Sequence, residues 1–346
     1  MQDNTIQPIV FADDCIRILD QTLLPDRVTY IVCSELETVA RAIERLSIRG
    51  APAIGVAAAM AVALEMSKKS CKKPDDRSEM LQACCSLLLQ TRPTAVNLRW
   101  SLERMKAVAE AHYDDEAGAF NDALKREALA IHQEEIQRNE AIGEFGQEIV
   151  PDPAVILTVC NTGSLAAPGK GTALGIVRTA FAAGKDVRVV VCETRPLLQG
   201  ARLTTWELSR DGIPFLLITD SMAAHYMKVR GVDLVIAGAD RIAANGDTAN
   251  KIGTYALAVL AKMHSVPFFI AAPVSTIDTS IPDGTCIPIE ERSCEEVLCI
   301  RNERIAPAGI TVWNPAFDVV PNDYISGIIT DKGVLAPPYD ETIATL

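Results

Sequence analysis

The feature that most constrains this fold is a series of five short apolar runs after residue 151, each rich in β-branched or aromatic side chains. Amphipathic stretches of helix length separate them. A strand that is apolar at every position has no side facing water, which is typical of a parallel sheet covered by helices on both faces. The sequence therefore predicts a Rossmann-like, doubly wound α/β domain. The runs are AVILTVC (154–160), VRVVVCE (187–193), FLLIT (215–219), VDLVIAGAD (232–240) and PFFIAAP (267–273).

The N-terminal part has a different pattern. Residues 15–33 alternate loosely between polar and apolar types, which predicts a hairpin-like pair of strands. After several helical patterns and a polar break at 114–120, a long amphipathic helix at about 121–149 is expected to link the two parts. We predict a smaller, mainly helical N-terminal domain with a short antiparallel sheet at 1–125, and the Rossmann-like catalytic domain at 126–346. The other predicted helices are Ser34–Leu46, Pro52–Met66, Arg77–Gln90 and Thr94–Tyr113.

The net charge of −12 argues against two classes of partner. An acidic surface repels nucleic acid and anionic lipid, so an anionic substrate must be caught by a local positive site. The first residues, MQDNTIQPIV, lack the basic start and apolar core of a signal peptide, and the apolar stretch Ile54–Leu64 is shorter than the ~20 residues of a membrane span. We expect a cytoplasmic protein.

The ten cysteines are scattered, and no Cys-x-x-Cys pair occurs. Without paired spacing or a histidine cluster the sequence predicts no metal site, and a chain of this length needs no disulfide framework. Most of these thiols are expected to be small buried hydrophobic side chains.

Polar residues follow three of the predicted strands. Cys160 ends the first run, Asp240 ends the fourth, and Gln199 follows the second together with Thr194 and Arg195. Ligands of open parallel sheets bind beyond the carboxyl ends of the strands. A thiol and a carboxylate at one sheet edge therefore form a candidate site.

The glycine-rich loop NTGSLAAPGKGTALG at 161–175 fits neither common nucleotide fingerprint. Five residues, rather than four, separate Gly163 from Gly169, and Lys170 is followed by glycine instead of Ser or Thr, so the P-loop pattern fails. The dinucleotide pattern misses by one residue, because Gly175 lies one position too far along. A backbone site for a smaller anion stays open.

Three other segments suit an anion. Arg49-Gly50-Ala51 precedes Pro52 at a predicted helix start, where free N–H groups and a guanidinium favour phosphate. Asn250-Lys251 is expected to open another helix, and Arg92 lies near the start of a third. We predict that these segments bind one phosphate.

Each of these residues also has a structural explanation. Cys160 alone is typical of a buried core thiol, Asp240 of a turn cap or a partner of Arg241, and Gln199 of a helix start. Arg92 is equally typical of a solvated charge, and the segment at Asn250 of a helix cap. The four histidines lie in helical stretches without a partner motif and receive no role. It is the convergence of several loops that favours a site.

Taken together, the motifs resemble those of methylthioribose-1-phosphate isomerases, in the superfamily that includes regulatory subunits of translation initiation factor 2B. The resemblance covers essentially the whole chain in family order. The motifs are SIRGAPAIGVAAA, TRPTAVNLRW, CNTGSLAAPGKGTALG, ETRPLLQGARLTTWEL, ITDSMAAH, GADRIAANGDTANKIGTYALA, IPIEER and NPAFD.

The resemblance implies an aldose–ketose isomerase of methionine salvage that converts 5-methylthioribose 1-phosphate to 5-methylthioribulose 1-phosphate, without a cofactor and as a homodimer. It implies Asp240 as the proton donor and Cys160 as a base or transition-state stabiliser. The implied substrate-binding residues are Arg49, Gly50, Ala51, Arg92, Gln199, Asn250 and Lys251. A carboxyl donates a proton near neutral pH only if burial raises its pKa, and the apolar strand before Asp240 would supply that burial.

One position departs from the family pattern, because Lys170 stands between two loop glycines where an aromatic residue is usual. A lysine there points either to solvent, which we favour, or to a substrate with a second phosphate. The alternatives are an isomerase of ribose 1,5-bisphosphate or 5-deoxyribose 1-phosphate, and a non-catalytic regulatory subunit that senses a sugar phosphate or nucleotide.

Overall fold

The computed structural model describes residues 7–12, 14–68, 73–92, 95–301 and 303–346. The predicted helix start at Thr94 and one cysteine, Cys71, lie outside these residues. The chain divides into two compact units, one of residues 1–137 with 164–169 and one of residues 138–163 with 170–346. This division falls inside helix α5 (Ala117–Gln147), which also contains the predicted boundary at residue 125.

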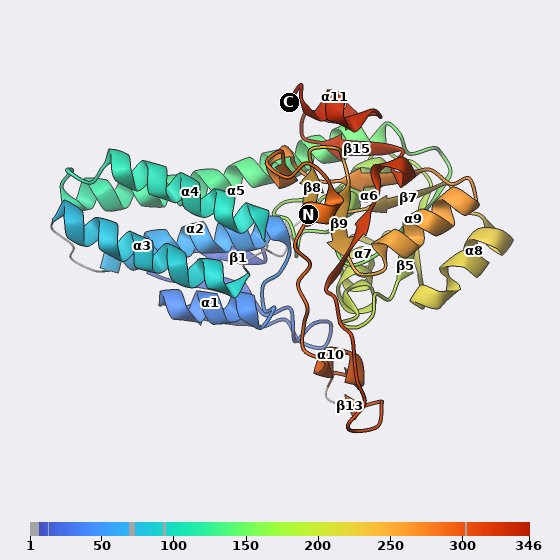
Figure 1. The fold of residues 1–346 in the computed structure, drawn as a ribbon, viewed down its shortest axis with the longest axis horizontal. Coiled ribbons are helices and arrows are strands. Elements are labelled where there is room, and N and C mark those ends of the chain that lie inside the picture. The colour runs from blue at the N-terminus through green and yellow to red at the C-terminus, as the bar shows by residue number, and fades with distance from the viewer. Residues whose placement is uncertain (1–6, 13, 69–72, 93–94, 302) are drawn as a thin grey trace. The chain divides into compact units, whose positions relative to one another are not determined.

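The first unit is helical and carries a short antiparallel sheet, as predicted. Strands β1, β2 and β3 pair in chain order, and the second and third form the expected hairpin. Helix α2 lies among the other helices (Figure 1) and is buried from Ala51 to Met66. The elements are β1 (Ile9–Phe11), β2 (Ile16–Leu19), β3 (Tyr30–Cys33), α1 (Leu36–Glu44), α2 (Ala51–Lys68), α3 (Pro74–Thr91), α4 (Val96–Ala111) and the first part of α5.

Two details of this unit differ from the prediction or qualify it. Helix α5 begins at Ala117, inside the expected polar break, because Phe120 is buried and stacks on Tyr113, and the guanidinium of Arg77 lies 4.5 Å from the Phe120 ring centre. Helix α2 is long and apolar enough to cross a membrane by length and composition, but 89% of it is buried within the protein.

The second unit is built on a seven-stranded sheet with strand order β16-β15-β10-β7-β4-β5-β6. All neighbours are parallel except the edge strand β16, so the predicted doubly wound sheet is confirmed. The strands are β4 (Ala154–Thr158), β5 (Val187–Cys192), β6 (Phe215–Ile218), β7 (Leu234–Ala237), β10 (Phe268–Ala271), β15 (Gly327–Thr330) and β16 (Gly333–Leu335).

Successive side chains of the central strands enter two different apolar clusters, one on each face of the sheet. In β4, Ile156 packs into one cluster with α6 (Ala173–Ala182) and α7 (Thr205–Asp211). Its neighbour Leu157 packs into the other with α8 (Ala223–Arg230), α9 (Thr254–Met263) and α11 (Tyr339–Ile343). Because both faces of the central strands are covered, nearly all of their positions are apolar, which explains the continuous runs in the sequence.

Two smaller sheets were not predicted. One has the order β11-β8-β9-β14 and the other pairs β12 with β13. Asn250 and Lys251 end strand β9, so the expectation that they open a helix is wrong; the helix starts after Gly253, whose φ is +100°. The elements are β8 (Arg241–Ala243), β9 (Thr248–Lys251), β11 (Ile277–Asp278), α10 (Glu295–Leu298), β12 (Cys299–Ile300), β13 (Glu303–Arg304) and β14 (Phe317–Val320).

Candidate functional site

Cys160 and Asp240 follow neighbouring strands at the carboxyl edge of the large sheet. Strands β4 and β7 pair in parallel, with Leu157 opposite Val235. Beyond the strands, a side chain on Gly238 would lie 2.8 Å from the Thr162 methyl group, so the two strand ends stay in contact. The structure thus places the thiol and the carboxylate behind adjacent strands, as the strand-end argument predicts.

The backbone of Cys160 is in the left-handed region, with φ at +64°, which costs a non-glycine residue roughly 1–2 kcal/mol. Two threonine hydroxyls hold it there. The Cys160 N–H donates to Thr194 Oγ1 at 2.8 Å, and Thr204 Oγ1 donates to the Cys160 carbonyl at 2.7 Å. Cys160 is buried, with 8% of the residue exposed.

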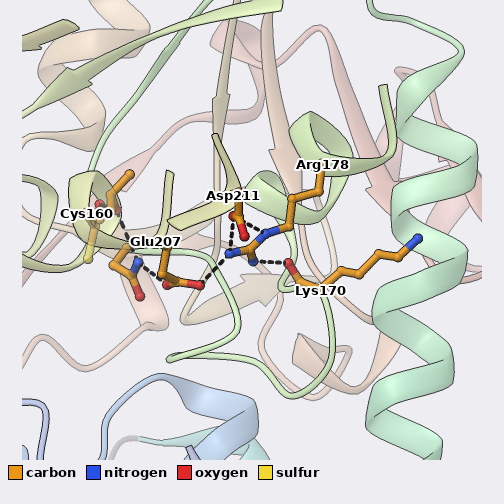
Figure 2. A network of polar contacts seen from close by, with 7 residues as sticks. Cys160, Lys170, Arg178, Glu207 and Asp211 are labelled. Carbon is orange, nitrogen blue, oxygen red and sulfur yellow. Dashed lines mark hydrogen bonds and ion pairs between the residues drawn. The ribbon is translucent and has the colours of Figure 1, made fainter. Parts of the chain in front are cut away.

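The loop after Cys160 is joined to a buried ion pair (Figure 2). Asn161 Nδ2 donates to Glu207 Oε1 at 2.7 Å and to Thr204 Oγ1 at 3.2 Å. The other carboxylate oxygen of Glu207 accepts from the Arg178 guanidinium at 2.8 Å. Burial lowers the pKa of Arg178, but the carboxylates of Glu207 and Asp211 outweigh it and raise that pKa overall. The guanidinium therefore stays charged and the carboxylate has a permanent counter-ion.

The glycine-rich loop folds back on itself, so its glycines serve close packing. A side chain on Gly171 would lie 2.4 Å from the Gly163 Cα, and Thr172 N–H donates to the Thr162 carbonyl at 2.8 Å. The Lys170 carbonyl accepts from Arg178 at 2.6 Å, while its side chain extends away from that network in Figure 2. Lys170 is half-buried, and its solvent-facing direction stays a prediction.

The segment after β5 carries Gln199. Asp220 fixes its start by accepting from the N–H groups of Thr194, at 2.8 Å, and Arg195, at 2.7 Å. Gln199 itself is 4% exposed, and its Oε1 accepts no hydrogen bond from the described residues. Gly200 follows, and a side chain on it would lie 1.8 Å from the Cys192 carbonyl. An unsatisfied buried amide oxygen is suited to a ligand hydroxyl.

Asn250 and Lys251 are held by the small sheet. Lys251 Nζ donates to the Ala316 carbonyl at 2.9 Å and lies 4.5 Å from the centre of the Phe317 ring. Asp318, opposite Asn250 in the β9–β14 pair, accepts from the N–H groups of Gly253 and Tyr255 at the start of α9. Burial raises the pKa of Asp318 to about 6, against the opposing effect of these hydrogen bonds and of Lys251.

Asp240 begins the turn into this small sheet, and its N–H donates to the Ala249 carbonyl at 2.9 Å. The neighbouring guanidinium of Arg241 lies 3.7 Å from the carboxylate of Asp278. Asp240 is half-buried. The acid is therefore anchored through its backbone to the strand that carries Asn250.

The remaining predicted residues belong to the first unit. Gly50 has a φ of +95°, and a side chain on it would lie 2.4 Å from the Ala166 carbonyl oxygen, so this close approach requires glycine. Ala51 opens α2, Arg49 is buried, and Arg92 is half-buried where α3 ends.

Sequence reasoning missed Asn161, Glu207, Asp220 and Asp318 as supporting residues. A signal for one of these residues, Glu207, was present in the sequence, because it is a charged residue next to the apolar Leu208 in a predicted helical stretch. Among the described residues, no group of three or more His, Cys, Asp or Glu side chains is arranged to hold a metal ion.

Comparisons with known proteins agree over nearly the full length. The profile of the Initiation factor 2 subunit family matches residues 47–337. A methylthioribose-1-phosphate isomerase of Pelotomaculum thermopropionicum is 52% identical, over 96% of this chain and 91% of the relative.

Two solved structures extend the comparison. The crystal structure of 5-methylthioribose 1-phosphate isomerase from Pyrococcus horikoshii OT3 has a TM-score of 0.92 at 44% identity, covering 99% of this chain and 96% of that one. The structure described as translation initiation factor eIF-2B, subunit delta, from A. fulgidus has a TM-score of 0.87 at 41% identity, covering 99% and 100%.

Proposed function

We propose a function from the premise that this chain belongs to the Initiation factor 2 subunit family and, within it, to the methylthioribose-1-phosphate isomerases. The proposed reaction converts 5-methylthioribose 1-phosphate to 5-methylthioribulose 1-phosphate in methionine salvage. The observation that carries the proposal for this chain's own residues is that Cys160 and Asp240 each follow one of two neighbouring parallel strands. An aldose–ketose isomerisation needs an acid and a group that handles the migrating hydrogen, and this edge offers both.

The reaction starts with ring opening. The phosphate on the anomeric oxygen blocks spontaneous opening to a free aldehyde, so the ring oxygen must be protonated while its bond to C1 breaks. Asp240 is the proposed donor of that proton, and its carboxylate is left behind. General-acid help of this kind contributes about 10²–10⁴-fold to a rate.

The second step moves hydrogen from C2 to C1. Along a proton route, the Cys160 thiolate removes the C2 proton, an enediol phosphate forms, and the resulting Cys160 thiol protonates C1. Along a hydride route, the hydrogen moves with its electron pair to the electron-poor C1, and Cys160 stabilises that charge. In both routes the C2 hydroxyl gives its proton to the Asp240 carboxylate left by the first step, C2 becomes the ketone and C1 becomes the CH₂ that bears the phosphate. The buried position of Cys160 limits access of water to either intermediate.

Substrate binding is proposed for the remaining family residues. Arg49-Gly50-Ala51, Arg92 and Lys251 supply cationic or N–H donors that suit a phosphate. The buried Oε1 of Gln199 is suited to accept a hydrogen bond from a sugar hydroxyl, and Asn250 lies on β9, where the Ala249 carbonyl accepts from the Asp240 N–H. We also propose a homodimer, which light scattering on the purified protein would test.

The experiment that tests the function is a comparative assay on 5-methylthioribose 1-phosphate, 5-deoxyribose 1-phosphate and ribose 1,5-bisphosphate. We expect the highest kcat/KM on the first. Highest turnover of another substrate would reassign the 5-substituent. No turnover of any would favour the regulatory alternative, for which the 41% identity to a structure described as a translation factor subunit is the specific observation.

Two variants test the roles. Cys160→Ser and Asp240→Asn should each abolish turnover while the substrate still binds, measured by calorimetry. Near-normal turnover in either variant would remove that residue from the mechanism.

A further inference from the structure

Glu207 is the centre of a network of polar contacts. Glu207 lies in α7 and is 2% exposed, so its carboxylate is removed from water. A buried carboxylate is tolerated only when it is paired and hydrogen-bonded. Its two oxygens face two different donors, Arg178 on one side and Asn161 on the other. The carboxylate therefore connects a charged anchor to the loop that follows Cys160.

The contact with that loop is also steric. A side chain on Gly163 would lie 2.4 Å from each carboxylate oxygen of Glu207, so the acid occupies the space that this glycine leaves open. Asn161, two residues earlier, binds the same carboxylate and Thr204 Oγ1. Glu207 thus touches the loop at two points directly after Cys160.

Thr204 completes the connection to the thiol residue. Its hydroxyl has one proton, which it donates to the Cys160 carbonyl at 2.7 Å, and its oxygen accepts from Asn161. The acceptor role leaves the hydroxyl proton directed at Cys160. Since Cys160 is in the left-handed region, its backbone needs such bonds to stay there. An unbroken chain of hydrogen bonds runs from Arg178 through Glu207, Asn161 and Thr204 to Cys160.

We propose that Glu207 is a positioning residue, which uses its ion pair with Arg178 to hold Asn161 and Thr204 and thereby fixes the left-handed backbone that aims the Cys160 thiol. This proposal rests on the proposed function in that it takes Cys160 as the group that handles the migrating hydrogen. It goes further by assigning a role to a helix residue that does not itself touch the reacting atoms.

The test is Glu207→Gln in the full-length protein. Glutamine keeps the shape, but both neighbours are donors, so its NH₂ group must face either Arg178 or Asn161 and one hydrogen bond is lost. We expect kcat to fall about 10–100-fold, as misplacement of a reacting group by a fraction of an ångström does. KM should stay within a factor of about three, because the change is not in substrate binding.

The chain offers a matched control, Asp211→Asn. Asp211 pairs with the same guanidinium, through Nη2 at 2.7 Å and Nε at 2.8 Å (Figure 2). The Asp211→Asn variant removes one carboxylate from Arg178 but keeps the hydrogen bond between Glu207 and Asn161. We expect kcat close to that of the wild type. An equal loss of kcat in both variants, or no loss in either, would overturn the proposal.

Two further measurements keep the proposal testable if Glu207→Gln folds poorly or the substrate is wrong. Thr204→Val leaves the ion pair intact, removes the hydrogen bond to the Cys160 carbonyl and should lower kcat in the same way. The alkylation rate of the Cys160 peptide with iodoacetamide, followed by mass spectrometry, needs no substrate. It should change in Glu207→Gln and Thr204→Val but not in Asp211→Asn, even if the wild type proves inactive on every sugar phosphate. An unchanged Cys160 rate in all three variants would refute positioning.

Discussion

Asp318 allows a prediction about stability as a function of pH. Its carboxyl has a pKa of about 6 in the folded protein against an ordinary value of 3.8, because burial outweighs the hydrogen bonds from the N–H groups at the start of α9. The folded state therefore binds this proton more tightly than the unfolded state. By linkage, stability is highest when the group is protonated and falls as pH rises from about 4 to about 6.

The size of the effect follows from the two pKa values. The full difference between low and high pH is about 3 kcal/mol, of which about 1.4 kcal/mol falls between pH 5 and pH 8. Asp318→Asn removes the titrating group. The free energy of unfolding of the variant, taken relative to the wild type, should therefore rise by about 1.4 kcal/mol from pH 5 to pH 8, whatever the constant cost of the lost hydrogen bond.

The assay is urea denaturation followed by circular dichroism at several pH values from 5 to 8, with matched ionic strength. A suitable control is Asp283→Asn, because hydrogen bonds from Thr285 lower the pKa of that exposed carboxyl. A lowered pKa stabilises the fold above the ordinary value and loses that effect only at more acid pH, so this variant should run parallel to the wild type across the range. Parallel curves for Asp318→Asn as well would refute the burial argument.

The other predictions concern packing and binding. Arg77 is 2% exposed and donates to two backbone carbonyls at 2.6 and 2.8 Å. Arg77→Met should therefore lower the free energy of unfolding by about 3 kcal/mol, and a loss under about 1 kcal/mol in urea titrations would contradict this. Gly200→Ala should lower the free energy of unfolding by about 3 kcal/mol or prevent folding, since the added Cβ would lie 1.8 Å from the Cys192 carbonyl oxygen. Gly118→Ala, which has open space around it, should leave the melting temperature unchanged or raise it. Arg92→Ala should raise KM for the phosphorylated substrate about tenfold or more with a smaller change in kcat, whereas an unchanged KM would mark Arg92 as a surface residue.

The large sheet could be predicted because its strands carry their own signal. Runs such as VVVC are apolar because both faces of a central strand are buried, and the chain has five apolar runs in order, although Phe215, Leu216 and Leu217 of the edge strand β6 are 37–45% exposed. The strand-end positions of Cys160 and Asp240 then followed from a general property of parallel sheets. Local sequence was sufficient because the constraint acts on every residue of each strand.

The small sheet could not be predicted, since its strands are short and partly polar. The sequence TANK contains three polar residues in four, and it forms a strand by pairing with β8 and with β14, whose residues Phe317 and Val319 lie about 70 positions away. The Glu207 network was hidden for the same reason, because its bond to Asn161 joins residues 46 positions apart. Contacts between distant residues leave no periodic pattern in a single sequence.

The left-handed backbone at Cys160 has a consequence for engineering the thermal stability of this protein. Glycine adopts such a conformation without the roughly 1–2 kcal/mol that an L-residue with a Cβ incurs, so a search for more heat-resistant variants would be drawn to Cys160→Gly. That change would delete the sulfur. Selection for melting temperature alone would therefore exchange the proposed catalytic thiol for thermal stability at this one position, and such a screen should hold residue 160 constant.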